Sequence, residues 1–299
     1  MESPKFKRVG FLTGLILMLA SVQASAATYT LTVEPNYPPA QAQEVYKPLL
    51  TYLSKSTGQT FVLKIAPNYH VHWRDMRSKT KVDFTFEEAH FTDYRAKRQR
   101  MIPLVRVVEP TKYTLLISDE MAAGGAQGLI GHRITSMSSP SLGYLLLGET
   151  YRNPIAQPEI KSFAANLADG VEMIFAGESD GAMVPSYIAD EYSNLQPAMV
   201  TRELPGRALS AHETVPADIR SKVKAAMLKL HLDNNLFDVI SELGTTKFVP
   251  TNAATYAGSE SVLRAAYGYA IPSYMKGVAT APVVPAAPVV VPAAPVKKP

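Results

Sequence analysis

Three serines lie close together just before an apolar stretch that could form a helix. They are Ser138, Ser139 and Ser141, and the apolar stretch begins at Leu142. The first backbone N–H groups of a helix have no partner within the helix and carry the positive end of its dipole, so such a start can bind an anion. A serine at this place can also simply cap the helix, which stabilises it by about 1 kcal/mol. The sequence leaves both roles open.

Acidic side chains supply the opposite charge at two places. Glu87 and Glu88 follow the segment 82–86, in which apolar and polar residues alternate, and Asp180 precedes the small-residue run that starts at Gly181. A carboxylate in a water-poor cleft needs a cationic or hydroxyl partner, because an unpaired buried charge is costly or becomes protonated. Serines at one end of a site and carboxylates at the other would suit an organic anion that also carries an amine or a hydroxyl. Asp180 can equally serve as a turn residue, and Glu88 as an acidic helix start.

Two tyrosines, Tyr37 and Tyr113, are candidates for the wall of such a site. A tyrosine ring offers apolar surface to a solute, and its hydroxyl can make a hydrogen bond. Both residues could equally belong to the hydrophobic core.

A metal-binding transport protein is a less favoured alternative. His70 and His72 are two residues apart, and Glu87, Glu88 and His90 come from a neighbouring strand end. Nitrogen and oxygen ligands of this kind are accepted by zinc or iron, but the His-Glu-x-x-His motif is absent. We therefore predict a site with no metal and no cofactor.

Several classes of enzyme lack their residues in this chain. It has no cysteine, which excludes disulfides, thiolate catalysis and thiolate metal sites. It also has no Gly-x-Ser-x-Gly elbow and no glycine-rich phosphate loop with a lysine. We predict a binding protein and not an enzyme.

The charge of the chain does not indicate a nucleic-acid partner. The formal net charge is +4, and residues 1–26 hold three Lys or Arg and one Glu, so removing them leaves +2. The one basic run, Arg95 to Arg100, is interpreted as a solvated helix end.

The elements that must position these residues follow a repeated order of strands and helices. In the first series we expect strands at 29–33, 59–66 and 82–86. One helix should end at Gly58, and a second should span 71–78. After Gly124 and Gly125 a second series gives strands at 129–135 and 181–184 and helices at 141–149 and 163–176, and two more helices follow at 216–231 and 233–243. Alternation of this kind predicts an α/β fold with mainly parallel sheets flanked by helices. Ligands gather at the carboxyl ends of such strands.

Both ends of the chain are predicted to lie outside this fold. Residues 1–26 combine a basic start, an apolar run from Phe11 to Ala20 and Ala-Ser-Ala before the expected cleavage site after Ala26. This pattern is typical of a secretory signal peptide, and the apolar run is shorter than the roughly 20 residues of a membrane-spanning helix. Residues 278–299 are rich in Pro, Ala and Val, which predicts a disordered, extended tail.

Five short motifs, taken in order, carry a resemblance to a known family. They are VYKPLLTYL at 45–53, VDFTF at 82–86, GHRI at 131–134, SSPSLGY at 138–144 and AGESDGA at 176–182. From about Tyr29 to Tyr256 the chain resembles the periplasmic solute-binding proteins of the phosphate and phosphonate type, which serve ABC importers. Where that family usually has Gly-Pro after the third strand, this chain has Glu87 and Glu88. The departure favours a zwitterion such as an aminoalkylphosphonate over bare phosphate.

The resemblance implies a type II periplasmic-binding-protein fold with a ligand cleft between two lobes. Lobe 1 would comprise residues 27–108 and 210–277, lobe 2 residues 109–209, and the hinge would lie near 107–116 and 203–212. In such proteins the acidic residue that matches Asp180 faces the ligand. The implied protein is a periplasmic monomer that binds a small-molecule solute and meets an inner-membrane ABC permease. An alternative is a ligand-sensing adaptor for a membrane receptor.

Overall fold

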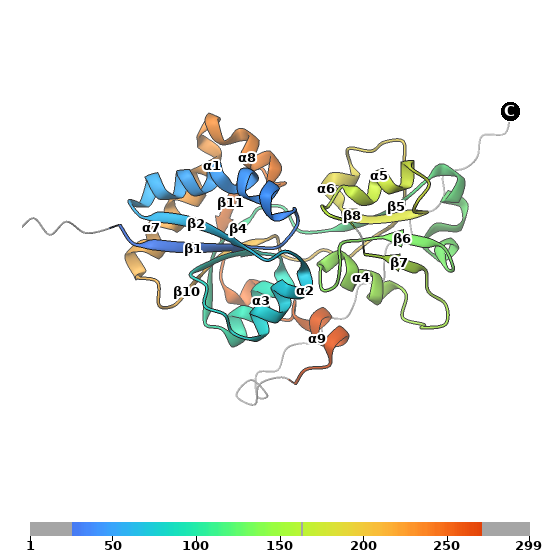
Figure 1. Ribbon diagram of the computed structural model, residues 1–299, viewed down its shortest axis with the longest axis horizontal. Coiled ribbons are helices and arrows are strands. Elements are labelled where there is room, and N and C mark those ends of the chain that lie inside the picture. Colours follow the sequence, from blue (N-terminus) through green and yellow to red (C-terminus); the bar gives the residue numbers. More distant parts are fainter. Residues whose placement is uncertain (1–25, 163, 271–299) are drawn as a thin grey trace, which may run out of the picture.

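The strands of this protein form two separate sheets, seen side by side in Figure 1. The structure is a computed structural model and describes residues 26–162 and 164–270, so the predicted tail and all but the last residue of the predicted signal peptide lie outside the described residues. The first sheet has the order β11-β4-β10-β3-β1-β2 and the second the order β7-β6-β8-β5-β9. The two-lobed α/β fold expected from the sequence is confirmed.

The strands of the first lobe are β1 (Thr28–Val33), β2 (Thr60–Ile65), β3 (Phe84–Glu87), β4 (Met101–Val107), β10 (Ala208–His212) and β11 (Phe248–Pro250). Its helices are α1 (Pro39–Thr57), α2 (Tyr69–Arg77), α3 (Ala89–Arg98), α7 (Ala217–Lys229) and α8 (Phe237–Glu242). Side chains of α1, α7 and α8 pack on one face of the sheet, whereas α2 and α3 cover the other.

The strands of the second lobe are β5 (Tyr113–Ile117), β6 (Arg133–Thr135), β7 (Glu159–Lys161), β8 (Gly181–Pro185) and β9 (Gln196–Val200). Helix α4 (Leu142–Thr150) covers one face, and α5 (Asp169–Phe175) and α6 (Ser186–Ala189) cover the other. The last helix of the described residues is α9 (Ser261–Tyr267). Among the described residues, no helix has the length and hydropathy that a membrane span needs.

Most strands of each sheet run in one direction, as the sequence predicts, but each sheet also contains antiparallel strands. β1 pairs parallel with β2 and β3, but β10 lies antiparallel between β3 and β4. In the second sheet β6 pairs parallel with β7 and β8, but β5 lies antiparallel between β8 and β9. β5 and β10 are the strands that the chain forms directly after crossing between the lobes. A crossing chain enters a sheet at the carboxyl ends of the other strands, so it must run in the opposite direction.

One strand and one helix are shorter than expected. The strand predicted at 129–135 is only β6, because residues Asp119–Leu129 form a 3-10 helix. The helix predicted at 163–176 begins at Asp169, whose carboxylate accepts hydrogen bonds from the backbone N–H groups of Ala165 and Asn166 and so holds a turn before it. Six strands of the described residues were not predicted from the sequence, namely β4, β5, β7, β9, β10 and β11.

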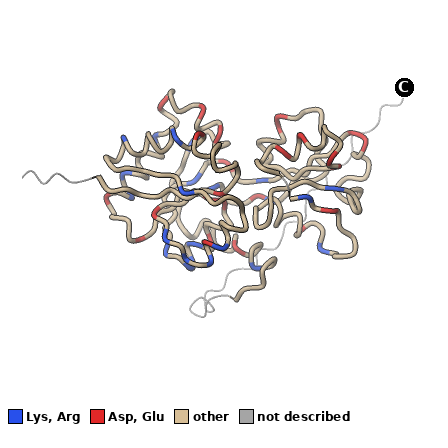
Figure 2. Tube along the Cα trace, in the orientation of Figure 1, with Lys and Arg blue, Asp and Glu red and all other residues tan. Residues whose placement is uncertain are grey.

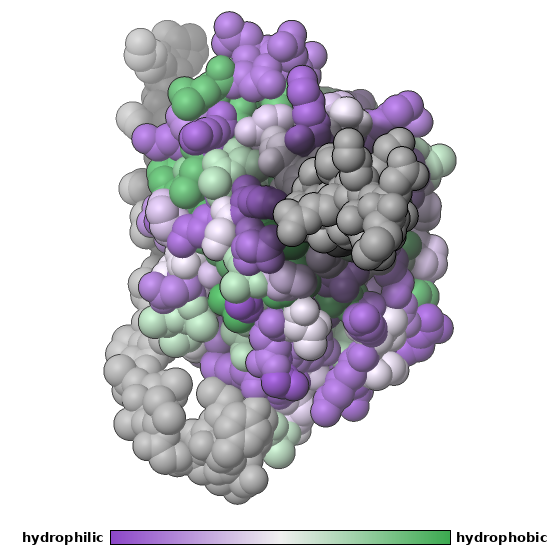
Figure 3. Space-filling view, turned by 90° about the vertical axis from the view of Figure 1, so that its left-hand side faces the viewer, coloured by the Kyte–Doolittle hydropathy of each residue, from purple (hydrophilic) through white to green (hydrophobic). Residues whose placement is uncertain are grey.

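One hydrophobic core continues from lobe to lobe. It joins Tyr69 and Phe91 of the first lobe to Leu115 and Ile134 of the second, and the buried Leu263 of α9 belongs to it. A second core, under α1 and α7, belongs to the first lobe alone. The lobes are therefore packed together on the side of α2, α3 and α4. Figure 3 shows the end of the first lobe that faces away from the second lobe. Hydrophilic residues cover most of the described surface that is visible there.

Charged residues of both signs are spread over both lobes (Figure 2). The basic run at the end of α3 is not a solvated helix end, because its cations have acidic partners. Arg95 pairs with Glu87, Lys97 with Asp93 and Arg98 with Glu260.

The chain crosses between the lobes twice, and the two crossing segments contact one another. Thr111 and Leu204 form an antiparallel bridge, in which the backbone nitrogen of each lies 2.8 or 2.9 Å from the carbonyl oxygen of the other. Gly206 makes this approach possible, since a Cβ atom there would lie 2.3 Å from the carbonyl oxygen of Glu109. The crossings fall within or beside the predicted hinge segments, and the lobe boundaries stay a prediction.

Replacing Gly206 with alanine should lower the free energy of unfolding by about 1–3 kcal/mol, because the crossing segments must move apart to admit the methyl group. Gly124→Ala is the matched control, since its Cβ would have nothing within 4 Å. Thermal and urea denaturation measure both effects. Equal stability of the two variants would contradict the close packing of the crossings.

Candidate functional site

A cavity of about 380 Å³ lies between the two lobes. Asn36 and Glu88 line it just beyond the carboxyl ends of β1 and β3, and Pro185 and Ser186 line it at the end of β8. The first crossing segment, 109–112, forms part of its wall. This is the place where ligands gather in α/β folds, and we take the cavity as the candidate site.

Arg207 is the most informative side chain of the cavity wall. It is partly buried, donates a hydrogen bond to the carbonyl oxygen of Leu243 and lies 5.0 Å from the centroid of the Phe86 ring. Burial lowers the pKa of Arg207, but nearby tyrosine hydroxyls and carboxyls raise it by more, so the guanidinium stays charged. It forms no ion pair with any residue that the structure describes. A charged group left unpaired beside a cavity is suited to an anion.

A second cation, Lys112, lines the cavity from the first crossing segment. Its ammonium lies 3.6 Å from the carboxylate of Glu203, and both side chains are exposed to solvent. Because an exposed pair of this kind is weak, Lys112 remains able to turn toward an anion.

Glu88 lines the cavity from the first lobe and contacts the second. Its Oε1 accepts a hydrogen bond of 2.8 Å from the hydroxyl of Tyr113, whereas its Oε2 has no hydrogen-bond partner among the described residues. Burial raises the pKa of Glu88 to about 7, although the Tyr113 hydroxyl, Arg207 and the backbone N–H of Leu142 act to lower it. Leu142 is the first residue of α4. Glu88 therefore lies at the helix N-terminus where the sequence analysis expected the solute's anionic group.

The three serines before α4 do not line this cavity. Ser141 is the N-cap of α4: its Oγ accepts a hydrogen bond from the N–H of Tyr144 and donates one to the carbonyl oxygen of Met137. The Oγ of Ser139 is 2.7 Å from the hydroxyl of Tyr267, and the carbonyl oxygen of Ser138 accepts a hydrogen bond from the N–H of Ser141. Their hydroxyls and backbone thus build the loop and hold α9 against it, and their binding of an anion stays a prediction.

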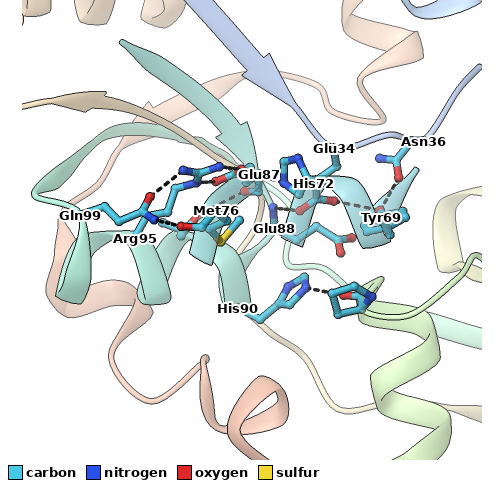
Figure 4. Close-up of polar contacts among 12 residues, drawn as sticks. Glu34, Asn36, Tyr69, His72, Met76, Glu87, Glu88, His90, Arg95 and Gln99 are labelled. Carbon is cyan, nitrogen blue, oxygen red and sulfur yellow. Dashed lines mark hydrogen bonds and ion pairs between the residues drawn. The ribbon is translucent and has the colours of Figure 1, made fainter. Parts of the chain in front are cut away.

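Glu87 points away from the cavity and into a buried ion pair (Figure 4). Its carboxylate accepts bonds of 2.7 and 2.9 Å from Arg95 and lies 3.0 Å from Nε2 of His72. Burial would raise the pKa of Glu87, but Arg95 and His72 together lower it to about 2. Of the two adjacent glutamates, only Glu88 reaches the cavity.

Two further expected residues lie elsewhere. Asp180 precedes β8, at the opposite end of this strand from the cavity, and its carboxylate accepts a 2.8 Å hydrogen bond from the backbone N–H of Arg133. The hydroxyl of Tyr37 donates a hydrogen bond to Glu242 within the first lobe. Asp180 thus fixes a turn, and Tyr37 joins the chain after β1 to α8.

The histidine pair expected for a metal site does not converge. Residues 69–77 form helix α2, in which positions i and i+2 point in different directions, so His72 is buried against Glu87 while His70 is exposed. A different set does meet: potential ligand atoms of Glu34, Glu88 and His90 all lie within 4.8 Å of one another. Burial and the Glu88 carboxyl raise the pKa of Glu34 well above its usual range, and burial lowers the pKa of His90 to about 3.

Arg207 was not predicted from the sequence as a candidate site residue. The only signal was its position directly after Pro205 and Gly206, inside the predicted hinge segment. A cation in the chain segment that crosses between two lobes is well placed to meet a ligand held between them.

A family model described as "ABC transporter, phosphonate, periplasmic substrate-binding protein" matches residues 31–256. No curated protein matches the chain. The fold is similar to a binding protein component of an ABC phosphonate transporter from Pseudomonas aeruginosa, with 12% identity, a TM-score of 0.66 and coverage of 80% of this chain and 86% of that one. PhnD1 from Prochlorococcus marinus, in complex with methylphosphonate, is 14% identical with a TM-score of 0.67, over 80% and 98% of the two chains. A Xanthomonas citri protein bound to ATP is 14% identical with a TM-score of 0.62, over 79% and 98%.

Glu87→Gln should lower the free energy of unfolding by about 3–5 kcal/mol, because it leaves the buried Arg95 without its counter-charge. The control is Asp75→Asn, which breaks the exposed pair between Arg74 and Asp75 and should cost about 0–1 kcal/mol. Chemical denaturation gives both values. A Glu87→Gln variant as stable as the control would show that the ion pair does not support the fold.

Proposed function

Because this chain belongs to the family of periplasmic substrate-binding proteins of phosphonate ABC transporters, we propose that it closes over a small organic anion between its lobes. The observation that carries this proposal is the guanidinium of Arg207 at the wall of the inter-lobe cavity, which forms no ion pair with the part of the chain that the structure describes. The protein would then present the closed form to an inner-membrane ABC permease. Such a cycle needs no covalent chemistry, so we assign no catalytic residue. The predicted signal peptide at 1–26 would bring the chain to the periplasm, where it would act as a monomer.

The chemistry of Arg207 favours a phosphonate or phosphate group as the anion. A guanidinium offers parallel N–H donors that match the oxygens of such a group, and charge-assisted hydrogen bonds of this kind are the strong ones. Its partly buried position strengthens the attraction, because less water screens it. The volume of about 380 Å³ suits a small solute.

Closure would depend on the two crossing segments. They carry the bridge between Thr111 and Leu204, and Lys112 and Arg207 flank that bridge in the chain. A few backbone torsions in such segments can swing one lobe against the other. An anion that Arg207 binds therefore sits beside the hinge, where it can contact both lobes at once.

The carboxylate of Glu88 supports the finer proposal of an amine-bearing or hydroxyl-bearing solute. Its Oε2 has no partner among the described residues and Glu88 lines the cavity, as does Asn36. A donor group on the solute would satisfy this oxygen and offset its charge. An aminoalkylphosphonate supplies both the anion for Arg207 and the donor for Glu88.

Arg207→Ala should weaken the binding of methylphosphonate by about 10- to 150-fold, the loss expected for one charge-assisted hydrogen bond. Arg202→Ala is the matched control, because Arg202 precedes the same crossing bridge but pairs with Glu149 and does not line the cavity. Isothermal titration calorimetry on folded variants measures the affinities. If Arg207→Ala binds as tightly as wild type, the anion does not lie at Arg207 and the proposal fails.

The amine is tested by a comparison of two solutes. We expect wild type to bind 2-aminoethylphosphonate at least about tenfold more tightly than methylphosphonate, and Glu88→Gln to remove this preference without weakening methylphosphonate binding. Asp190→Asn, which changes another carboxylate of the cavity wall, is the control. A wild type without the preference, or a preference lost only in Asp190→Asn, would contradict the role of Glu88.

A further inference from the structure

Three side chains that commonly bind metals meet at the buried boundary between the lobes. Glu34 follows β1, Glu88 precedes α3, and His90 is the second residue of α3. Their exposed fractions are 2%, 4% and 0%, and their potential ligand atoms lie within 4.8 Å of one another. We propose that this cluster binds a divalent transition-metal ion of the zinc class.

The hydrogen bond of His90 leaves one ring nitrogen free for a metal. Its Nε2 is 3.1 Å from the carbonyl oxygen of Pro140. A carbonyl can only accept, so Nε2 carries the proton and Nδ1 keeps its lone pair. Nδ1 is buried and has no hydrogen-bond partner among the described residues. Histidines that bind metals typically donate their other N–H to a carbonyl or a carboxylate, which fixes the tautomer and the direction of the ring.

Each carboxylate has one oxygen held by a donor and another that is less well satisfied. Glu88 accepts from Tyr113 through Oε1 and has no partner at Oε2 within residues 26–162 and 164–270. Glu34 accepts from the N–H of Glu88 at 2.8 Å through Oε1. Its Oε2 is 3.3 Å from the hydroxyl of Tyr69, which lies closer, at 2.5 Å, to Oδ1 of Asn36. The outer partners thus orient both carboxylates and leave an oxygen of each for a cation.

Buried polar atoms normally have partners, and unpartnered ones require an explanation. Here a free imidazole nitrogen and a free carboxylate oxygen belong to one cluster of three residues, next to a second carboxylate (Figure 4). Arg207 contributes positive charge toward both carboxylates but forms no ion pair with either. A divalent cation would satisfy these atoms together and offset two negative charges in a site with little water.

The ligand set indicates the class of metal. An imidazole nitrogen with two carboxylate oxygens suits Zn²⁺ and similar ions, whereas Ca²⁺ and Mg²⁺ prefer oxygen ligands in larger number. Three protein ligands leave a fourth position open, and one of these ligands, Glu88, also lines the cavity. Water from the cavity could complete the coordination.

Opening of the lobes would give the ion access. Glu34, Glu88 and His90 belong to the first lobe, whereas Tyr113 and Pro140, which contact Glu88 and His90, belong to the second. The inference does not depend on the proposed solute. A metal ion and the amine of a solute would compete for Oε2 of Glu88, so the metal is tested without solute.

The experiment is calorimetric titration of the chelator-treated, full-length exported chain with ZnCl₂, followed by metal analysis after gel filtration. We expect one Zn²⁺ per chain and no comparable binding of Ca²⁺. His90→Gln and Glu34→Gln should each weaken Zn²⁺ binding at least about tenfold. His132→Gln should leave it unchanged, because His132 is an exposed histidine beside Asp180, far along the second sheet from the cavity. Circular dichroism checks that each variant is folded, and Glu88→Gln replaces any variant that is not.

A second readout comes from Trp73, the single tryptophan of the chain. Its ring is 6.2 Å from that of Phe91, which in turn lies 4.0 Å from the ring of His90. Zn²⁺ should change its fluorescence in wild type and in His132→Gln, and not in His90→Gln. The inference is overturned if wild type binds no Zn²⁺, or if His132→Gln loses the ion while His90→Gln and Glu34→Gln keep it. Retained methylphosphonate binding in chelator-containing buffer would show that the proposed function stands even then.

Discussion

The hydroxyl of Tyr113 donates a hydrogen bond to Glu88, and this contact joins the two lobes beside the cavity. Tyr113 opens the first strand of the second lobe, whereas Glu88 follows the third strand of the first. Gly143 in the first turn of α4 lets the Tyr113 ring approach, because a Cβ there would lie 2.8 Å from it. With Glu88 held at this helix end, the protein's own carboxylate lies where an anionic solute would otherwise bind. We therefore propose that the solute's negative charge is met at Arg207.

The adjacent glutamates show how backbone geometry divides two roles. Successive side chains of extended backbone point to opposite sides. Glu87, the last residue of β3, therefore turns to Arg95 and His72 and stabilises the first lobe, while Glu88 turns to the second lobe and the cavity. The buried carboxylate of Glu87 is thus paired, whereas the neighbouring Glu88 keeps one oxygen without a partner among the described residues. Glu88 is therefore the glutamate that can respond to a ligand.

Local patterns were sufficient to predict an α/β fold with two series of strands and helices, since the periodicity of apolar residues indicates which strands and helices form. The two lobes with a cleft between them were given by the family resemblance. The antiparallel entry of β5 and β10 depends on where the chain crosses, which periodicity does not contain. Only Glu88 of the two lines the cavity, but both Glu88 and Tyr113 were predicted as site residues, Glu88 from its place at a strand end and Tyr113 from its residue type. Arg207 was not, because a single arginine after Pro-Gly has no recognisable pattern until folding places it at the cavity. The role of Ser141 could not be decided from sequence, since capping and anion binding require the same residue at the same position.

The position of a bound phosphonate tests this account most directly. A crystal structure of the protein with methylphosphonate should show the phosphonate oxygens in contact with the Arg207 guanidinium, with the Tyr113 hydroxyl still bound to Glu88. A phosphonate bound instead to the backbone N–H groups at the start of α4, with Glu88 displaced from them, would contradict it.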